Sequence, residues 1–451
     1  MRISIGLSLT ASLLIALGMA RPATAQYRWR AGVARVDITP RESIWLAGYG
    51  ARTKSSEGVL EPIYAKALAL QDETGAITVL VTSDLLGFPK DVADPIADQV
   101  RAKYGIGRER LALNSSHTHS GPVIGNMLRP AYGMSPEHEA VVRRYTSRLI
   151  DQVVDLIGNA MQKLEPAQVS FSQGLAGFAV NRRRVTQRGL PGPVDHDVPV
   201  LAVRAAESGL LRAVVFGYAC HNTVLADYVI NGDYAGFAQE ALEKAHPGAT
   251  AMFVEDCGAD ANPLPRRSVE LARRYGAILA DAVDEVLRGK MRPQSGPITA
   301  AFELVDIAFQ PPPSRQEFQS RLSDHDVSRA RHAKYMLSIY ERDGKLPSRY
   351  PYPVQVWRLG SGLQWIILGG EVVVDYSLRL KKQYGWDDTW VAAYSNDVFA
   401  YIPSLRVLKE GGYEGGGAMI PYGQPSPFTE SVEETIAVKV DELVRRTGGP
   451  R

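Results

Sequence analysis

The spacing of hydrophobic positions alternates along the chain between strand-like and helical patterns. Three pairs of apolar, β-branched runs flank short polar turns and predict antiparallel hairpins: residues 65–71 with 77–83, 198–205 with 211–219, and 354–359 with 365–368. Apolar residues at helical spacing predict helices at 89–104, 136–164, 234–245, 268–287 and 315–342. Hairpins mixed with strand–helix units predict an α/β fold, with a mixed β-sheet core flanked by helices.

Five of the predicted strands run directly into a polar cluster. The strands are residues 111–115, 211–219, 249–254, 365–370 and 390–394, and the residues that follow them include His117, His119, His221, Asp260, Glu371 and Tyr401. In α/β sheets, ligands bind where strands end, because the strands fix positions and the following loops carry the chemistry. Imidazoles, carboxylates and a phenol are ligands that zinc accepts. The pattern predicts a zinc site at the strand ends of a metal-dependent enzyme.

Each candidate ligand also has a simpler interpretation. His117 and His119 lie two positions apart on the continuation of a strand. We therefore expect them on opposite faces unless the chain turns, with one binding the metal directly and the other acting as acid or base. His221 also fits a buried histidine bonded to a backbone carbonyl. Glu371 fits the N-terminal acid of a helix over residues 372–382, and Tyr401 fits core packing.

The composition narrows the possible functions. The chain has 451 residues, 45% of them hydrophobic and 22% charged, and a formal net charge of +2. These ordinary globular values provide for a large core and give no indication of nucleic-acid binding or polybasic membrane attachment. The basic runs at 182–184 and 265–267 are predicted to be solvated loops, and 411–417 a flexible glycine-rich loop. The proline-rich crossing at 310–313 predicts a connection within one domain.

The first 25 residues have the pattern of a signal peptide. Arg2 precedes an apolar stretch over residues 3–19, and Ala23 and Ala25 form a small-residue cleavage pattern, so we expect the mature chain to start at Gln26. The alternative is an uncleaved anchor helix, for which the apolar run is slightly short. No other stretch is long and apolar enough to span a membrane. We expect an exported protein, periplasmic or extracellular.

The two cysteines of the chain, Cys220 and Cys257, both lie in polar clusters at strand ends. In an oxidising compartment they could pair. They could equally be buried thiols that pack as small hydrophobes. Both alternatives stay open, because pairing depends on the separation of the Cα atoms.

Residues 114–122, Asn-Ser-Ser-His-Thr-His-Ser-Gly-Pro, resemble the histidine signature of the neutral/alkaline ceramidases. That family consists of exported zinc amidases that hydrolyse the N-acyl bond of ceramide to a sphingoid base and a fatty acid. Segments at 34–40, 46–50, 181–182, 219–223, 370–380, 400–404 and 413–414 resemble further motifs of the family, in the same order. The resemblance implies a single ceramidase-like catalytic domain over residues 26–451.

The resemblance also implies a role for each candidate residue. It implies that one zinc ion is bound by His117, His221, Glu371 and Tyr401, and that Arg182 and Tyr413 face the substrate. Zinc lowers the pKa of a bound water to about 7, and we expect this water to attack an amide carbonyl. His119 is expected to act as acid/base or to hold the oxyanion, with Arg182 and Tyr413 stabilising it. Asp260 is expected to orient a zinc-binding histidine.

Two departures from the family pattern bear on the substrate. The turn at 258–263 has Ala261 where the serine of the family would fall, so no serine nucleophile is expected. We also expect no C-terminal immunoglobulin-like domain. The predicted function is a zinc-dependent amidohydrolase that acts on ceramide or a related N-acyl compound. The alternatives are a hydrolase of the same scaffold with a non-ceramide amide or ester as substrate, and an inactive zinc-stabilised binding protein.

Overall fold

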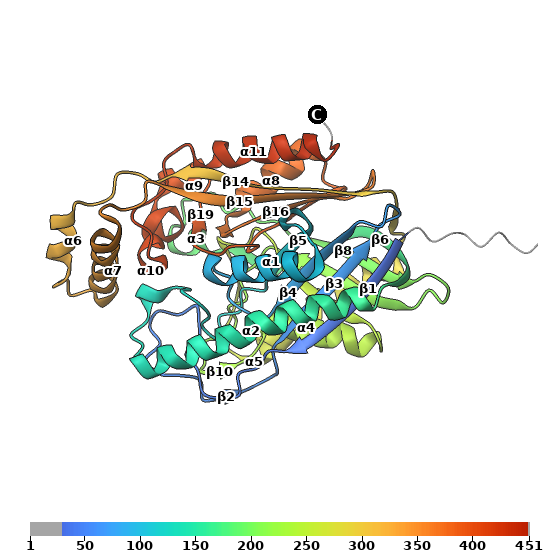
Figure 1. Cartoon of the computed structure of the whole chain (residues 1–451), viewed down its shortest axis with the longest axis horizontal. Coiled ribbons are helices and arrows are strands. Elements are labelled where there is room, and N and C mark those ends of the chain that lie inside the picture. Colours follow the sequence, from blue (N-terminus) through green and yellow to red (C-terminus); the bar gives the residue numbers. More distant parts are fainter. Residues whose placement is uncertain (1–28, 450–451) are drawn as a thin grey trace, which may run out of the picture.

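A computed structural model describes residues 29–449 of the protein (Figure 1). The predicted signal peptide over residues 1–25 and the start at Gln26 lie outside the described residues. No helix between residues 29 and 449 combines the length and the apolar character that crossing a bilayer requires.

Two β-sheets form the centre of the described structure. The larger sheet has nine strands in the order β11-β9-β8-β6-β1-β3-β4-β5, with β13 paired to β6. Its strands are β1 (Trp29–Asp37), β3 (Tyr64–Gln71), β4 (Ile77–Ser83), β5 (Leu111–Ser115), β6 (Glu165–Leu175), β8 (Asp197–Ala205), β9 (Leu211–Tyr218), β11 (Thr250–Glu255) and β13 (Arg292–Gln294). The smaller sheet, in the order β14-β15-β16-β18, contains β14 (Ile298–Ala308), β15 (Arg349–Leu359), β16 (Gln364–Leu368) and β18 (Thr389–Ala392).

Helices cover the outer face of each sheet, so the layers run helix, sheet, sheet, helix (Figure 1). The helices against the larger sheet are α1 (Lys90–Tyr104), α2 (Pro136–Gln162), α4 (Asp233–Ala245) and α5 (Val269–Arg288). Those against the smaller sheet are α8 (Val374–Tyr384) and α11 (Val432–Arg446). Shorter helices are α3 (Arg182–Thr186), α6 (Arg315–Arg321), α7 (Val327–Asp343), α9 (Leu405–Glu410) and α10 (Met419–Tyr422). The predicted mixed α/β fold is confirmed.

The two sheets pack through tryptophans of the smaller sheet. Trp357, Trp365 and Trp390 are all buried and lie against the inner face of the larger sheet. The rings of Trp365 and Trp390 stack with centroids 4.1 Å apart. Because successive residues of a strand face opposite sides, the neighbours of these tryptophans, such as Ile366 and Val391, pack instead in the cluster that contains α8 and α11.

All three predicted hairpins are present, as β3–β4, β8–β9 and β15–β16. The pairs β4–β5, β9–β11 and β16–β18 are parallel. Parallel strands end at the same edge of a sheet, which brings the polar sequences that follow β5, β9, β11, β16 and β18 to one region of the molecule.

Two predictions about individual elements were wrong. The helix expected over 315–342 is two helices, α6 and α7, because Asp326 caps a new helix by accepting hydrogen bonds from the backbone N–H groups of Ser328 and Arg329. The helix expected over residues 372–382 is present as α8, with bounds two residues later. The glycine-rich segment expected to be a loop contains one π-helical turn, Tyr413–Gly417, preceded by Gly411 and Gly412 at positive φ. Of the two cysteine alternatives, the structure shows free, buried thiols.

Asn114, at the end of β5, joins the ends of strands from both sheets. Its side-chain nitrogen donates to the carbonyl of Ala393 at 2.8 Å and to the hydroxyl of Ser395 at 3.0 Å. Its side-chain oxygen accepts from the backbone N–H of Glu255 at 3.1 Å. This buried amide therefore fixes the relative positions of the loops that carry the candidate site.

Replacing Asn114 with alanine should lower the free energy of unfolding by about 2–4 kcal/mol, because buried backbone groups on two other strands lose their partners. Asn126→Ala, a matched change at an exposed position, should cost less than about 0.5 kcal/mol. Urea unfolding monitored by circular dichroism checks both values. Equal unfolding midpoints for the two variants would contradict the structural role given to Asn114.

Candidate metal centre

A sharp turn after β5 brings His117 and His119 together. His117 has a φ of 61°, in the left-handed region that non-glycine residues rarely adopt. The turn cancels the alternation of a strand, and the Nε2 atoms of His117 and His119 lie 3.1 Å apart. The chain therefore turns here, which is the condition under which the two histidines were not expected on opposite faces. The ligand atoms of His117, His119 and His221 all lie within 4.8 Å of one another, in a buried group that could hold a metal ion.

Backbone carbonyls orient two of these imidazoles. The Nδ1 atom of His117 lies 2.7 Å from the carbonyl oxygen of Leu86, and that of His221 lies 2.8 Å from the carbonyl oxygen of Gly258. Since a carbonyl can only accept, each Nδ1 carries the proton, and in the neutral ring Nε2 is left with a lone pair. Burial, followed by the charge of Arg182, lowers the pKa of His221 to about 4.

Glu371 and Tyr401 come side by side through a short parallel pair of strands. Glu371 lies in β17 (Glu371–Val372) and Tyr401 in β19 (Tyr401–Ile402), where they are direct partners in the register. Glu371 is therefore a strand residue, and its interpretation as a helix N-terminal acid was wrong. The phenol of Tyr401 lies 3.1 Å from Nε2 of His221.

Three acceptor atoms converge with no proton between them. Oε2 of Glu371 lies 3.1 Å from Nε2 of His117 and 3.1 Å from Nε2 of His221. This oxygen is buried and has no hydrogen-bond donor among the described residues. Two imidazole nitrogens and a carboxylate oxygen so arranged fit a divalent cation such as zinc.

Tyr422 of α10 supports Glu371 from the other side. Its hydroxyl donates to Oε1 of Glu371 at 2.5 Å, which fixes the carboxylate and leaves Oε2 directed at the histidines. The sequence analysis missed this residue, because the segment Met419-Ile420-Pro421-Tyr422 resembles any stretch that packs an aromatic ring in the core.

Arg182 lies beside the candidate ligands. It donates to the phenol oxygen of Tyr401 at 2.9 Å, and its Nη1 lies 3.3 Å from Nε2 of His221. Burial would lower the pKa of Arg182, but Tyr401 and Glu414 raise it well above the usual value. The guanidinium therefore keeps its charge next to the centre.

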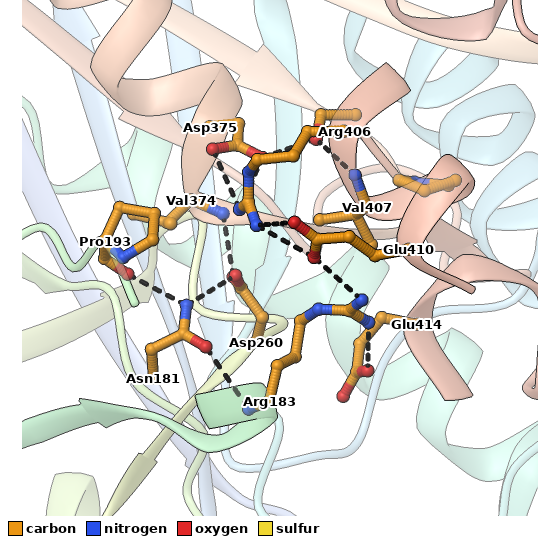
Figure 2. A network of polar contacts seen from close by, with 12 residues as sticks. Asn181, Arg183, Pro193, Asp260, Val374, Asp375, Arg406, Val407, Glu410 and Glu414 are labelled. Carbon is orange, nitrogen blue, oxygen red and sulfur yellow. Dashed lines mark hydrogen bonds and ion pairs between the residues drawn. The ribbon is translucent and has the colours of Figure 1, made fainter. Parts of the chain in front are cut away.

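A buried ladder of ion pairs holds Arg182 in place, and Figure 2 shows most of it. Glu414 accepts from Nε of Arg182 at 2.7 Å and from Nη1 of Arg183 at 2.8 Å. Arg183 also pairs with Glu410 at 3.1 Å, and Glu410 pairs with Arg406 at 3.0 Å. The basic run at 182–184 was predicted to be a solvated loop. That was wrong for Arg183, whose side chain is 4% exposed.

Asp260 takes part in this framework without contacting a histidine ring. Its two carboxylate oxygens accept from Asn181 Nδ2 at 2.8 Å and from the backbone N–H of Val374 at 2.9 Å (Figure 2). Its carbonyl accepts from the backbone N–H of Arg182 at 2.7 Å. Backbone carbonyls orient the histidines instead, so Asp260 positions the start of α3 and the start of α8. The expectation that it orients a zinc-binding histidine is corrected accordingly.

A cavity of about 430 Å³ opens above the centre. Its walls include His119, Arg182, Tyr401 and Tyr413, so four of the residues predicted for the site face one space. Burial and the neighbouring imidazoles of His117 and His221 hold the pKa of His119 well below its usual value. A neutral imidazole at the cavity wall can donate one proton and accept another.

The amino-acid sequence matches the model of one protein family, "Neutral/alkaline non-lysosomal ceramidase, N-terminal", over residues 29–274. That match covers more than half of the chain. The chain belongs to the neutral/alkaline ceramidase family. The predicted resemblance is therefore confirmed.

Individual members of the ceramidase family agree with this assignment. The chain is 24% identical to neutral ceramidase of Drosophila pseudoobscura pseudoobscura over 52% of its own length, and 22% identical to that of Drosophila melanogaster over 48%. It spans only about a third of the length of these relatives (34% and 32%). The crystal structure of neutral ceramidase from Pseudomonas aeruginosa shares the fold, with a TM-score of 0.74 at 18% identity, over 94% of this chain and 75% of that one. A ceramidase complexed with C2 gives the same TM-score, with 76% of its chain covered.

Replacing Glu414 with glutamine should lower the free energy of unfolding by about 3–5 kcal/mol at neutral pH, because Arg182 and Arg183 lose a buried counter-charge. The exposed pair of Arg379 with Glu434 gives a control, and Glu434→Gln should cost less than about 1 kcal/mol. Although burial opposes it, Arg182 and Arg183 lower the pKa of Glu414. The stabilisation is therefore present above the unfolded-state pKa of about 4.3 and is lost as the pH falls through the lower folded-state value. Denaturant unfolding of both variants from pH 3 to 7 measures this, and a pH-independent difference would disprove the charge-based explanation.

Proposed function

We propose that this protein is an exported, zinc-dependent amidohydrolase that cleaves the N-acyl bond of ceramide or of a related N-acyl compound. The observation that carries the proposal is the buried convergence of His117 Nε2, His221 Nε2 and Glu371 Oε2 below an open cavity. Membership of the ceramidase family supports an amide bond as the target. Export rests on the signal-peptide pattern of residues 1–25.

His117, His221, Glu371 and Tyr401 would hold the zinc ion. Bound there, zinc would act as a Lewis acid and would lower the pKa of a water molecule to about 7, which provides a nucleophile without a serine. This matters because Ala261, at the position of the family's serine, is a buried residue of the short strand β12 (Ala261–Pro263).

The residues around the centre can carry the remaining chemistry. Arg182 places a fixed positive charge beside the position where a carbonyl oxygen would become an oxyanion. Tyr413 lies at the cavity wall, and a phenol keeps its proton at neutral pH, so its hydroxyl can donate a hydrogen bond. His119 can take a proton from the nucleophile and return one to the leaving amine.

Cleavage of a non-ceramide amide or ester on the same scaffold is the second candidate. The observation that favours it is Ala261, which stands where the serine of the family would fall. A binding protein without catalysis is less well supported, because zinc retention alone does not need Arg182 and Tyr413 at the cavity wall.

Purified protein with a measured metal content should release fatty acid from a labelled panel of N-acyl compounds that includes ceramide. Chelator should abolish release, and added zinc should restore it, because the three converging acceptor atoms need a cation. Zinc-dependent cleavage of another conjugate, without ceramide turnover, would establish the second candidate. Bound zinc with no cleavage of any amide or ester would overturn the proposed activity.

Two substitutions should separate metal binding from catalysis. His221→Ala removes a ligand and should reduce bound zinc at least about tenfold. Arg182→Ala should leave the zinc content unchanged and lower kcat/KM about 10²- to 10³-fold, because it removes a charge that stabilises the oxyanion. Metal analysis by mass spectrometry and steady-state kinetics of both variants provide the readouts. Full zinc in the His221 variant, or zinc loss in the Arg182 variant, would show that the roles are wrongly assigned.

A further inference from the structure

The lining of the cavity above the candidate centre has more positive than negative side chains. Arg182, Arg183 and Arg266 contribute to its lining, and Glu414 is the one acid among the lining residues that the structure describes. A cavity with this balance favours an anionic ligand over a neutral one.

The acids in the ladder of ion pairs neutralise the charges of Arg182 and Arg183. Going outward from the cavity, three arginines alternate with three acids. The last pair is that of Arg406 with Asp375, at 2.9 Å (Figure 2). The members are Arg182, Glu414, Arg183, Glu410, Arg406 and Asp375. The formal charges of these six residues sum to zero. The ladder therefore has no net charge that would attract a ligand.

Arg266 differs from these arginines. It follows β12 and is half-buried at the cavity wall. No residue between 29 and 449 forms a hydrogen bond or an ion pair with its guanidinium, whereas the adjacent Arg267 donates to the phenol of Tyr49 at 3.1 Å. Partial burial and the charge of Arg267 lower the pKa of Arg266, although Tyr49 and Asp233 oppose this shift. A partly desolvated arginine with five free donors is suited to bind a carboxylate or a phosphate.

The same cavity offers apolar surface near its mouth. Val185 is 56% exposed and Tyr413 is 49% exposed, and both line the cavity together with Leu264. Large exposed apolar side chains grouped around an opening are typical of a binding surface for an apolar ligand. The lining therefore provides for an acyl chain and for an anionic group in the same ligand.

We propose that the substrate is an N-acyl compound that also carries an anionic oxygen group, a carboxylate or a phosphate, and that Arg266 binds this group and so determines specificity. This inference rests on the proposed amide hydrolysis and goes beyond it, because ceramide itself carries no charge. Arg266 acts on substrate choice and lies outside the group of metal-binding side chains.

The test compares charged substrates with neutral counterparts that have the same acyl chain. N-dodecanoylglycine is paired with its amide, and N-dodecanoyl phosphoethanolamine with N-dodecanoylethanolamine. The zinc-loaded wild type should show a kcat/KM about 10- to 100-fold higher for at least one charged member than for its neutral counterpart. Arg266→Gln should bring this ratio close to one without changing the zinc content. Arg274→Gln, which removes a charge from an exposed position on α5, should keep the wild-type ratio.

The pair that responds identifies the anionic group as a carboxylate or a phosphate. Equal or better turnover of the neutral compounds by the wild type would overturn the inference and leave the amidohydrolase intact. A ratio that survives in the Arg266 variant would overturn the role of this residue. If the zinc-loaded wild type cleaves no member of the panel and no ceramide, the proposed function fails, and the inference that rests on it fails as well.

Discussion

The site depends on electrostatic repulsion between three hydrogen-bond acceptor atoms, which the fold holds close to one another. Oε2 of Glu371 lies 3.1 Å from Nε2 of His117 and 3.1 Å from Nε2 of His221. All three side chains are buried. Backbone carbonyls fix the protons on the far nitrogens, and Tyr422 fixes the other carboxylate oxygen. Such an arrangement is costly without a positive charge at its centre. A bound cation turns the same repulsion into coordination, which links folding of this region to metal binding.

The surrounding architecture keeps these atoms in place. His117 follows a strand of the larger sheet, whereas Glu371 follows β16 of the smaller sheet, so the centre spans the junction of the two sheets. Asn114 bonds the strand ends to one another, and Asp260 ties the start of α3 to the start of α8. The ladder from Arg182 to Asp375 extends the support into α9. Function here depends on long-range contacts between loops that rigid strands present.

Much of the fold and the strand-end candidates for the metal site could be predicted from the sequence, because hairpins, amphipathic helices and polar strand ends are local patterns. Arg182 and Tyr413 were candidates only through the resemblance to the ceramidase family. The rest could not be predicted, because tertiary contacts override the local pattern there. The positive φ of His117 places it beside His119, although strand alternation separates them. Arg183 resembles a solvated residue until Glu410 and Glu414, more than 200 positions away, bury it. Tyr422 carries no sequence signal, since a hydroxyl that supports a metal ligand looks the same as one in the core.

Diffraction from crystals of the zinc-loaded protein, recorded on both sides of the zinc absorption edge, tests the central claim most directly. The account predicts one strong anomalous peak in the space between His117, His221 and Glu371, at about 2.0–2.2 Å from their ligand atoms, with the phenol of Tyr401 as the remaining protein ligand. A peak bound by other residues, or no zinc peak at this position in protein that contains stoichiometric zinc, would contradict it.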